Sequence, residues 1–266
     1  MAVQLAEVQA AAQRKHERLS HSVQEVVDWD PNTRSGHSRT AHFNFSVSVP
    51  NGTTVCLDIV QSRRELNEPG EPQLGTGGVV WMAAVGLARY LEHHCTSGLE
   101  DWRVLELGCG TGLVSYVAAA LGASVTCTDT PECLAKVTVP NIEANATRLQ
   151  GSVAARELVW GQTALEPAFG QGVNWWELVV AADCVYRSEH AALLLHTLQG
   201  VLGPGRKALV ALDRRGREGS NAFLQAAGSA ESGFAMREVD NAVEMPSGYR
   251  FVHFLLVELT RISEMD

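Results

Sequence analysis

Residues 104–112 read VLELGCGTG, which is the most informative stretch of the chain. Its apolar start is typical of a buried strand, and the apolar pattern after Gly112 indicates a helix. Glycines allow a ligand to approach the main chain where a Cβ atom would collide with it. The free N–H groups at the start of the helix then face that ligand. We therefore expect a strand, a tight turn and a helix, with a cofactor site at residues 106–112.

Short apolar runs alternate with helical patterns on both sides of this unit. We expect strands at 103–107, 124–128, 153–159, 177–182 and 207–212, and helices at 79–94, 112–121, 131–146, 188–202 and 217–229. Two further runs, at 234–239 and 250–259, are interpreted as strands that end the sheet. Continuous apolar strands between helices are typical of a parallel sheet covered on both faces. The sequence therefore predicts an α/β fold.

The residues before this domain differ from it in character. Residues 1–38 are polar, and we interpret them as a flexible or weakly helical arm; a docking segment and a solvated tail are both open interpretations. Residues 42–60 alternate apolar and polar side chains around an Asn-Gly pair, which is the strongest short signal for a β-hairpin. We therefore divide the chain into an arm at 1–38, a hairpin and loop extension at 39–75, and the α/β domain at 76–266.

The composition narrows the range of functions. The 266 residues carry a net charge of −9, which argues against nucleic acid as a partner, since clustered Lys and Arg are needed to bind a phosphate backbone. The six cysteines form no C-x-x-C pair, so we expect neither a disulfide framework nor a bound metal. No apolar run is long enough for a membrane span, and the N-terminus lacks a signal-peptide pattern. We expect a cytoplasmic protein, with the nucleus as a second location, and no membrane partner.

The acid in the glycine motif distinguishes between cofactors. A dinucleotide-binding turn would have its third glycine at the position of Leu113. Glu106, two residues before the first glycine, would repel a pyrophosphate but suits a cofactor with an ammonium group and hydroxyls. S-adenosyl-L-methionine carries both and contains no phosphate. We therefore expect S-adenosyl-L-methionine; the alternative is a tight strand–helix turn without a ligand.

A second acid follows the strand predicted at 124–128. Asp129 lies 19 positions after Gly110 (129 − 110), at the tip of the second parallel strand. An acid there is placed to accept both hydroxyls of an adenosine ribose, as in dinucleotide-binding folds. The alternative is that Asp129 caps the next helix, since Pro131 suits the first helical position.

A third acid, Asp183, follows the strand predicted at 177–182, and Tyr186 lies three residues later. Ligands of open parallel sheets lie beyond the carboxyl ends of the strands, so both side chains should face the same crevice as Glu106. An acceptor oxygen and a phenol at that point could orient an attacking amine. Alternatively, Asp183 caps the helix predicted at 188–202 or a turn before it.

Two tryptophans stand near the ends of predicted elements. Trp160 lies at the tip of the strand predicted at 153–159 and could stack on an adenine; a tryptophan that only fills the core more often lies inside a strand or helix. Trp81 could cover the cofactor from the first turn of a helix. The histidines show no metal-ligand spacing. We interpret His190 and His196 as surface or hydrogen-bonded side chains.

Four ordered segments carry a resemblance to a known family: GVVWMAA at 78–84, VLELGCGTG at 104–112, LVWG at 158–161 and ADCVY at 182–186. The chain resembles the methyltransferase-like 21 group (family 16) of seven-strand S-adenosylmethionine-dependent protein-lysine methyltransferases. The resemblance implies a Rossmann-like seven-strand sheet, mostly parallel with an antiparallel last strand. The last of the four segments is similar to the branch that acts on the hexameric ATPase valosin-containing protein.

The resemblance also implies roles for individual residues. The cofactor would be bound by these residues: Trp81, Glu106, Gly108, Gly110, Asp129, Trp160 and Ala182. Asp183 and Tyr186 would be the catalytic pair that lines the access route of the lysine. The substrate would be a lysine side chain of a partner protein of the chaperone, AAA ATPase or elongation factor type. We expect the chain to act as a monomer.

Two other functions stay open at this point. A methyltransferase of the same fold could act on another nucleophile, such as a nucleobase amino group, a small-molecule amine or another protein side chain. The run from Asp183 to Tyr186 loosely resembles the D-P-P-Y loop of enzymes that methylate nucleobase amino groups, but it lacks the prolines. The chain could also be a non-catalytic binding module that keeps the fold as an interaction surface.

Overall fold

The computed structural model describes residues 42–61, 76–161, 175–213, 218–240, 243–246 and 254–263. All of them belong to one compact unit, Thr40–Asp266. The arm predicted at 1–38 and most of the loop predicted before residue 75 lie outside the described residues, so these two interpretations and the division at residue 75 stay predictions.

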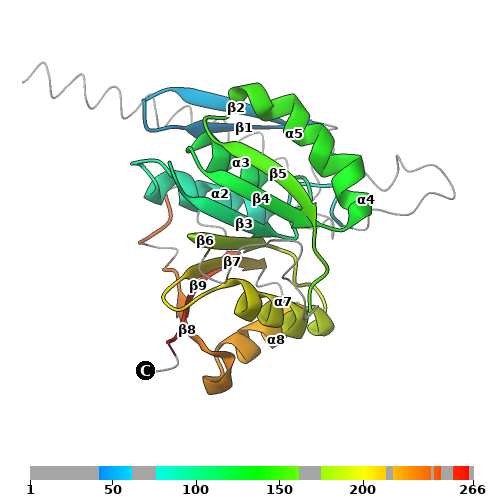
Figure 1. The fold of residues 1–266 in the computed structure, drawn as a ribbon, viewed down its shortest axis with the longest axis vertical. Coiled ribbons are helices and arrows are strands. Elements are labelled where there is room, and N and C mark those ends of the chain that lie inside the picture. The colour runs from blue at the N-terminus through cyan, green and yellow to red at the C-terminus, as the bar shows by residue number, and fades with distance from the viewer. Residues whose placement is uncertain are drawn as a thin grey trace, which may run out of the picture. The chain divides into compact units, whose positions relative to one another are not determined.

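A seven-stranded sheet forms the centre of this unit, in the order β5-β4-β3-β6-β7-β9-β8 (Figure 1). Its strands are β3 (Arg103–Leu107), β4 (Ser124–Asp129), β5 (Ser152–Glu157), β6 (Leu178–Ala182), β7 (Lys207–Asp213), β8 (Phe234–Glu238) and β9 (Phe254–Arg261). The first five are parallel to one another, and β9 is antiparallel to both β7 and β8. The predicted α/β fold with a mostly parallel seven-strand sheet and an antiparallel last strand is confirmed.

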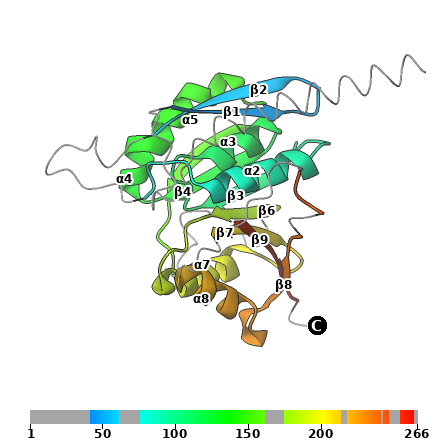
Figure 2. The same cartoon turned by 180° about the vertical axis from the view of Figure 1, so that it is seen from behind.

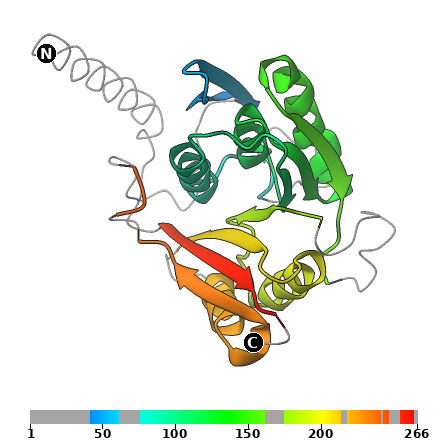
Figure 3. The same cartoon turned by 60° about the vertical axis from the view of Figure 1, so that its left-hand side comes forward.

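Helices cover both faces of the sheet (Figure 3). One face carries α2 (Met82–His94) and α3 (Leu113–Ala120), and the other carries α7 (Ser188–Val201) and α8 (Glu218–Ala227). In the central strand β3, Leu105 and Leu107 belong to the same buried cluster as the inward side chains of α7 and α8. The alternating residues Val104 and Glu106 are also buried, so β3 has no solvent-facing side.

The helix predicted at 131–146 is divided into shorter pieces. It begins as α4 (Pro131–Cys133), widens into a π-helical turn, η2 (Leu134–Thr138), and continues as α5 (Val139–Asn145) and a short 3-10 turn, η3 (Ala146–Arg148). The N–H of Val139 donates to the carbonyl of Leu134, five residues back. The next residue, Pro140, has no N–H to continue an α-helical ladder, which explains why the register changes at this point.

The predicted hairpin is confirmed as an antiparallel pair of strands, β1 (His42–Ser48) and β2 (Thr54–Val60). In its turn, Gly52 has a φ of +82°, and the Asn51 side chain accepts the N–H of Thr53 at 2.9 Å. Phe45 and Ile59 are among the side chains buried on its inner face. The alternation of apolar and polar side chains in the sequence therefore agrees with a hairpin that is buried on one face.

Helix side chains cover both edges of this hairpin. Asn141 and Asn145 of α5 accept the N–H groups of Val60 and Asp58 at 2.8 and 3.0 Å and donate to the carbonyls of the same two residues. These bonds replace the pairing that a third strand would make. Seen from behind, the hairpin runs beside α5 on the side of the sheet that carries α2 and α3 (Figure 2).

The opposite edge of the hairpin is covered by α2. Glu92 accepts the N–H of Ser48 at 2.7 Å, and Arg89 donates to the carbonyl of Ser46 at 2.7 Å.

The six cysteines, all within the described segments, are free thiols. Over the same segments, no helix combines the length and apolar character that crossing a bilayer requires.

Candidate functional site

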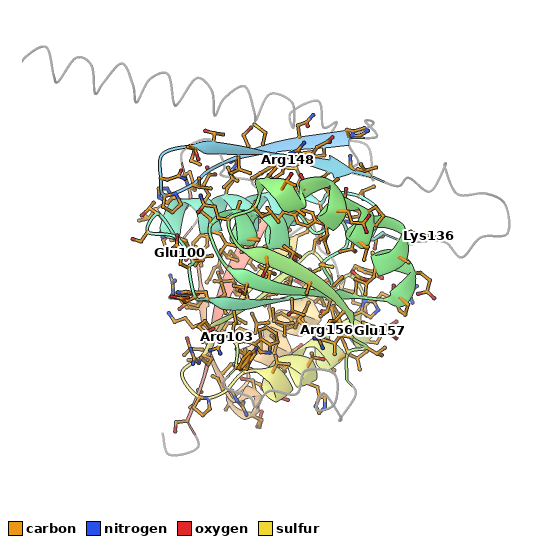
Figure 4. The ribbon with its side chains drawn as sticks, turned by 45° about the horizontal axis from the view of Figure 1, so that its top comes forward. Glu100, Arg103, Lys136, Arg148, Arg156 and Glu157 are labelled. Atoms are coloured by element: carbon orange, nitrogen blue, oxygen red, sulfur yellow. The ribbon has the colours of Figure 1, made fainter. Side chains whose placement is uncertain are left out.

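The predicted site residues gather at the carboxyl ends of three adjacent strands. In the sheet β3 lies between β4 and β6, and its last residue, Leu107, pairs with Thr128 and Ala181. Asp129 and Ala182 are the next residues of those two neighbouring strands, and Gly108 is the next residue after β3. Figure 4 shows Arg103, the first residue of β3, at the opposite end of the sheet from Glu157, the last residue of β5.

The glycine turn after β3 is approached closely from two sides. Gly108 and Gly110 have φ values of +68° and +52°, a conformation that glycine adopts without steric cost. A Cβ atom on Gly108 would lie 2.9 Å from the Cβ of Cys184 and 3.1 Å from the ring of Trp160. One on Gly110 would lie 2.9 Å from the carbonyl of Gly77. The structure therefore brings the segments before α2, after β5 and after β6 onto this turn.

Glu106 holds the glycine turn to the helix that follows it. Its carboxylate is buried and accepts the N–H of Ser115, in the first turn of α3, at 2.9 Å, together with the Ser115 hydroxyl. Desolvation raises the pKa of Glu106 to about 8, outweighing the two Ser115 hydrogen bonds that favour the charged form. This capping role is not evident from the sequence, because the accepting carboxylate lies nine residues before the donating N–H, on the other side of the glycine turn.

Asp129 is bonded to the glycine turn itself. Its Oδ2 accepts the N–H of Gly110 at 2.8 Å, and its Oδ1 accepts the N–H of Thr130 at 2.7 Å. Thr130 occupies the capping position of α4, and its hydroxyl accepts the N–H of Cys133 at 3.4 Å. The alternative that Asp129 caps the next helix is therefore wrong, although Pro131 does stand at the start of that helix. Burial also raises the pKa of Asp129.

The chain turns sharply after β6. Asp183 has a φ of +51°, is 9% exposed, and its N–H donates to the carbonyl of Ala211 at 2.9 Å. The residue that precedes α7 in the capping position is Arg187, so Asp183 does not cap that helix. Tyr186 lies in the connecting segment and is 42% exposed. A buried carboxyl and an exposed phenol thus stand three residues apart at the tip of β6.

The two predicted tryptophans are in different environments. Trp160, partly buried, lies close to the glycine turn through its approach to Gly108. Trp81 precedes α2, and its indole N–H donates to the carbonyl of Thr76 at 2.9 Å. The segment that carries Trp81 reaches the glycine turn at Gly77.

Three side chains at this end of the sheet were not foreseen from the sequence. Thr138, in the π-helical turn, donates to the carbonyl of Gly110 at 2.7 Å. Asn141 donates to the carbonyl of Thr111 at 3.3 Å and so links the glycine turn to the hairpin. The third is His190, which contacts the rings of both Trp160 and Tyr186. Only the helical spacing of His190, Leu193 and Thr197 could have indicated a shared face on α7.

Comparison with known proteins places this chain in a family. The sequence profile of a family described as lysine methyltransferase matches residues 62–230. The protein N-lysine methyltransferase METTL21A of Mus musculus is 40% identical over 150 residues, which cover 56% of this chain and 66% of that protein. METTL21A of Danio rerio is 43% identical over 129 residues, covering 48% and 56% of the two chains. The protein-lysine methyltransferase METTL21E of Bos taurus is 41% identical over 123 residues, covering 46% and 42%.

The alignments thus span less than two thirds of these curated relatives. Among solved structures, the 16S rRNA N2 methyltransferase RsmC of T. thermophilus, in complex with AdoMet and guanosine, is similar with a TM-score of 0.51 and 15% identity. That match covers 84% of this chain and 52% of the other, and it supports the fold alone. The fold is that of S-adenosylmethionine-dependent methyltransferases. Since the family profile covers more than half of its residues, the chain belongs to the lysine methyltransferase family.

Proposed function

We propose that this protein is an S-adenosylmethionine-dependent protein-lysine N-methyltransferase. The observation that carries the proposal is the meeting of the glycine turn, Asp129 and the Asp183–Tyr186 segment at the adjoining carboxyl ends of β3, β4 and β6. This is the edge at which ligands of open parallel sheets bind. Membership of the lysine methyltransferase family supports the same activity.

The residues present fit the cofactor. Asp129 offers carboxylate oxygens for the ribose hydroxyls, and the missing Cβ atoms of Gly108 and Gly110 let Trp160 and Gly77 approach the turn that would hold the cofactor. We assign adenine stacking to Trp160, which lies close to Gly108, and a cofactor contact to Ala182 at the tip of β6. We assign Trp81 a covering role. When bound, the cofactor supplies a methyl group on a sulfonium, which a neutral amine can attack.

Glu106 adds an electrostatic preference for a cation. Its hydrogen bonds come from Ser115, which is uncharged, and its pKa near 8 reflects the cost of an ionised carboxylate in this buried position. A positive charge nearby offsets that cost. We propose that Glu106 holds the glycine turn in place and favours a cofactor that carries an ammonium group and a sulfonium.

The lysine chemistry requires orientation more than a strong base. With the cofactor bound, the methyl group would pass to the neutral amine, the electron pair of the C–S bond would stay on sulfur, and the surplus proton of the amine would leave to solvent. Holding the amine in line with that bond lowers the barrier. We assign the orienting role to Asp183, whose carboxyl is buried at the tip of β6, and the shaping of the access route to Tyr186. Desolvation of the amine favours its neutral form.

The substrate we propose is a lysine of a partner protein of the chaperone, AAA ATPase or elongation factor type. Two arguments support a protein: the named relatives are protein-lysine methyltransferases, and the net charge of −9 disfavours nucleic acid. Within this proposal, the resemblance of the segment at 182–186 favours an AAA ATPase. We also propose that the protein acts in the cytoplasm as a monomer.

The experiment is transfer of labelled methyl groups from S-adenosylmethionine into a cell lysate, followed by mass spectrometry of methylated lysines. We expect label in protein that is lost after protease treatment and kept after RNase treatment. Asp183→Asn should abolish the label while leaving the fold intact, and His196→Ala, an exposed change on α7, should not affect it. Label that survives protease and disappears with RNase would overturn the protein substrate. Absence of cofactor binding by calorimetry would instead favour a non-catalytic binding module.

A further inference from the structure

His190 occupies the space between the two sides of the proposed site. Its ring centroid lies 6.3 Å from that of Trp160 and 4.7 Å from that of Tyr186, and both pairs are nearly perpendicular, at 90° and 87°. Perpendicular rings at these distances attract each other through their charge distributions. One side chain therefore contacts both the tryptophan on the cofactor side and the tyrosine on the substrate side.

Polar bonds do not explain where this ring lies. The Nδ1 atom of His190 is buried and has no hydrogen-bond partner among the described residues. A buried ring nitrogen without a partner lowers stability rather than raising it. Among the described residues, the ring of His190 makes two aromatic contacts, with Trp160 and Tyr186, and its role is argued from these.

His190 is also part of a stripe on α7 that holds the turn after β5. Thr197 accepts the N–H of Gly161 at 3.1 Å, and a Cβ atom on Gly161 would collide with the side chain of Leu193. His190, Leu193 and Thr197 are spaced by three and four residues, so they share one helix face. Trp160 directly precedes Gly161, and its ring is therefore held by the same face that contacts Tyr186.

We propose that His190 is a positioning residue that couples the cofactor side of the site, at Trp160, to the lysine access route, at Tyr186. This inference rests on the proposed function for the roles of the two aromatic side chains. Binding of the cofactor against Trp160 transmits to Tyr186 through the His190 ring, so that the access route takes its final shape when the methyl donor is present. An aromatic ring at position 190 is what this coupling requires.

The test follows Tyr186 directly by fluorine NMR. The chain has four tyrosines, and in protein labelled with fluorotyrosine the Tyr186 signal is identified by its loss in Tyr186→Phe. We expect S-adenosylmethionine to shift this signal in the wild-type protein. His190→Leu, which keeps much of the volume but no ring, should abolish the shift and weaken cofactor binding by about three- to tenfold in calorimetry. His190→Phe should restore both, because it keeps the ring and removes the unpaired nitrogen.

His196→Ala is the matched control, since it changes another histidine of α7 that is exposed to solvent. It should leave the shift and the affinity unchanged. The proposal is overturned if folded His190→Leu keeps the Tyr186 shift, or if folded His190→Phe loses it. Thermal melting of each variant establishes that it is folded, and His190→Ala is a second ring-deleting variant should the leucine not fold.

These readouts are separate from the proposed activity. If lysate proteins are not methylated but the Tyr186 shift still depends on the ring at position 190, the proposed function fails and the coupling stands. If the cofactor does not bind, Trp160→Phe supplies the perturbation. It should then move the Tyr186 signal in the wild-type background and not in His190→Leu, and movement in both backgrounds would overturn the coupling.

Discussion

At the amino end of the sheet the carboxylate of Glu177 is paired with guanidinium groups, whereas at the carboxyl end Glu106 and Asp129 accept hydrogen bonds from uncharged groups. Glu177 binds Arg103 through two nitrogens of its guanidinium, one of them at 2.8 Å, and lies 3.7 Å from Arg206. Figure 4 shows Arg103 at the far end of the sheet from Glu157.

The pKa values of the carboxyl groups at the two ends shift in opposite directions. The hydrogen bonds and charge of Arg103 lower the pKa of Glu177 to about 2, whereas desolvation raises the pKa of Glu106 to about 8 and also raises that of Asp129. A paired carboxylate stabilises the fold in its charged form. A buried carboxylate without a cation favours protonation until a positive ligand arrives. One end of the sheet therefore uses a charged carboxylate for stability, whereas at the other end burial disfavours the charged forms of Glu106 and Asp129.

The largest expected effect is on cofactor binding by Asp129→Asn. Loss of the charged acceptors for the ribose hydroxyls should weaken S-adenosylmethionine binding by about 100-fold or more, since hydrogen bonds to charged groups contribute about 1.5–3 kcal/mol each. Isothermal titration calorimetry measures the affinity. Glu157→Gln is the matched control, because this exposed acid is paired with Asp129 in the neighbouring strand and should bind the cofactor normally. Unchanged affinity of Asp129→Asn for S-adenosylmethionine would contradict a binding role for the carboxyl end of the sheet.

The next effect is on stability at the other end. Glu177→Gln should lower the free energy of unfolding by about 2 kcal/mol at pH 7, a value reduced for the partial exposure of Arg103. Cofactor binding should stay unchanged. Because the pKa of Glu177 is below its ordinary value in the folded state, the stabilisation is complete above about pH 4.5 and is lost as the pH falls toward 2. Urea unfolding at pH 7, 5, 4 and 3 measures the difference in unfolding free energy between Glu177→Gln and the wild type. This difference should shrink as the pH falls, and a constant difference would contradict the prediction.

The third effect is the pH dependence caused by Glu106. The pKa of Glu106 is raised in the folded state. Its contribution to the free energy of unfolding is therefore complete below about pH 4.5 and is lost as the pH rises through about 8. Wild-type stability should therefore fall relative to Glu106→Gln by at most about 1.4 kcal/mol per pH unit across this range. Urea unfolding at pH 5.5, 6.5 and 7.5 measures the slope. Saturating S-adenosylmethionine should flatten it, and parallel profiles for the two proteins would refute the buried-acid interpretation.

The smallest effect isolates the capping role of Glu106 from its charge. Ser115→Ala removes the hydroxyl that donates to Glu106 but leaves the backbone N–H bond of the same residue. We expect a loss of about 1 kcal/mol in unfolding free energy, since one hydrogen bond of this kind contributes about that much. Equilibrium unfolding at pH 7 measures it. A loss as large as that of Glu177→Gln would mean that the carboxyl end of β3 also relies on polar bonds for stability.

Much of the fold could be read from local patterns. The Asn-Gly turn at 51–52, the apolar strand ending in Leu107 and the glycine turn after it are short-range signals, and the structure contains each of them. The helix expected at 131–146 is divided in the structure, because Pro140 has no N–H to continue the α-helical hydrogen bonds and the register changes there.

The candidate site was foreseen in part. Periodicity and strand tips indicated that Glu106, Asp129 and Asp183 would face one edge, since parallel strands end together. The same reasoning could not tell that Thr130 caps α4 in place of Asp129, or that Glu106 bonds to Ser115. Those outcomes depend on loop geometry, which a pattern of residue types does not specify.

The amino-acid sequence alone was sufficient for the order of elements and for the types of residue at the strand tips, because these follow from periodicity, glycine and proline chemistry. Only the tertiary structure decided which of these side chains contact one another. A buried carboxylate at Glu106 and a paired one at Glu177 are the same residue type, and only their neighbours separate a pKa of about 8 from one of about 2. His190 is a clear case: Tyr186 lies only four residues before it, but its contact with Trp160, 30 positions earlier (190 − 160), exists only in the folded chain. Contacts between residues far apart in the chain arise from packing of whole elements, and they exist only once the sheet and its helices have assembled.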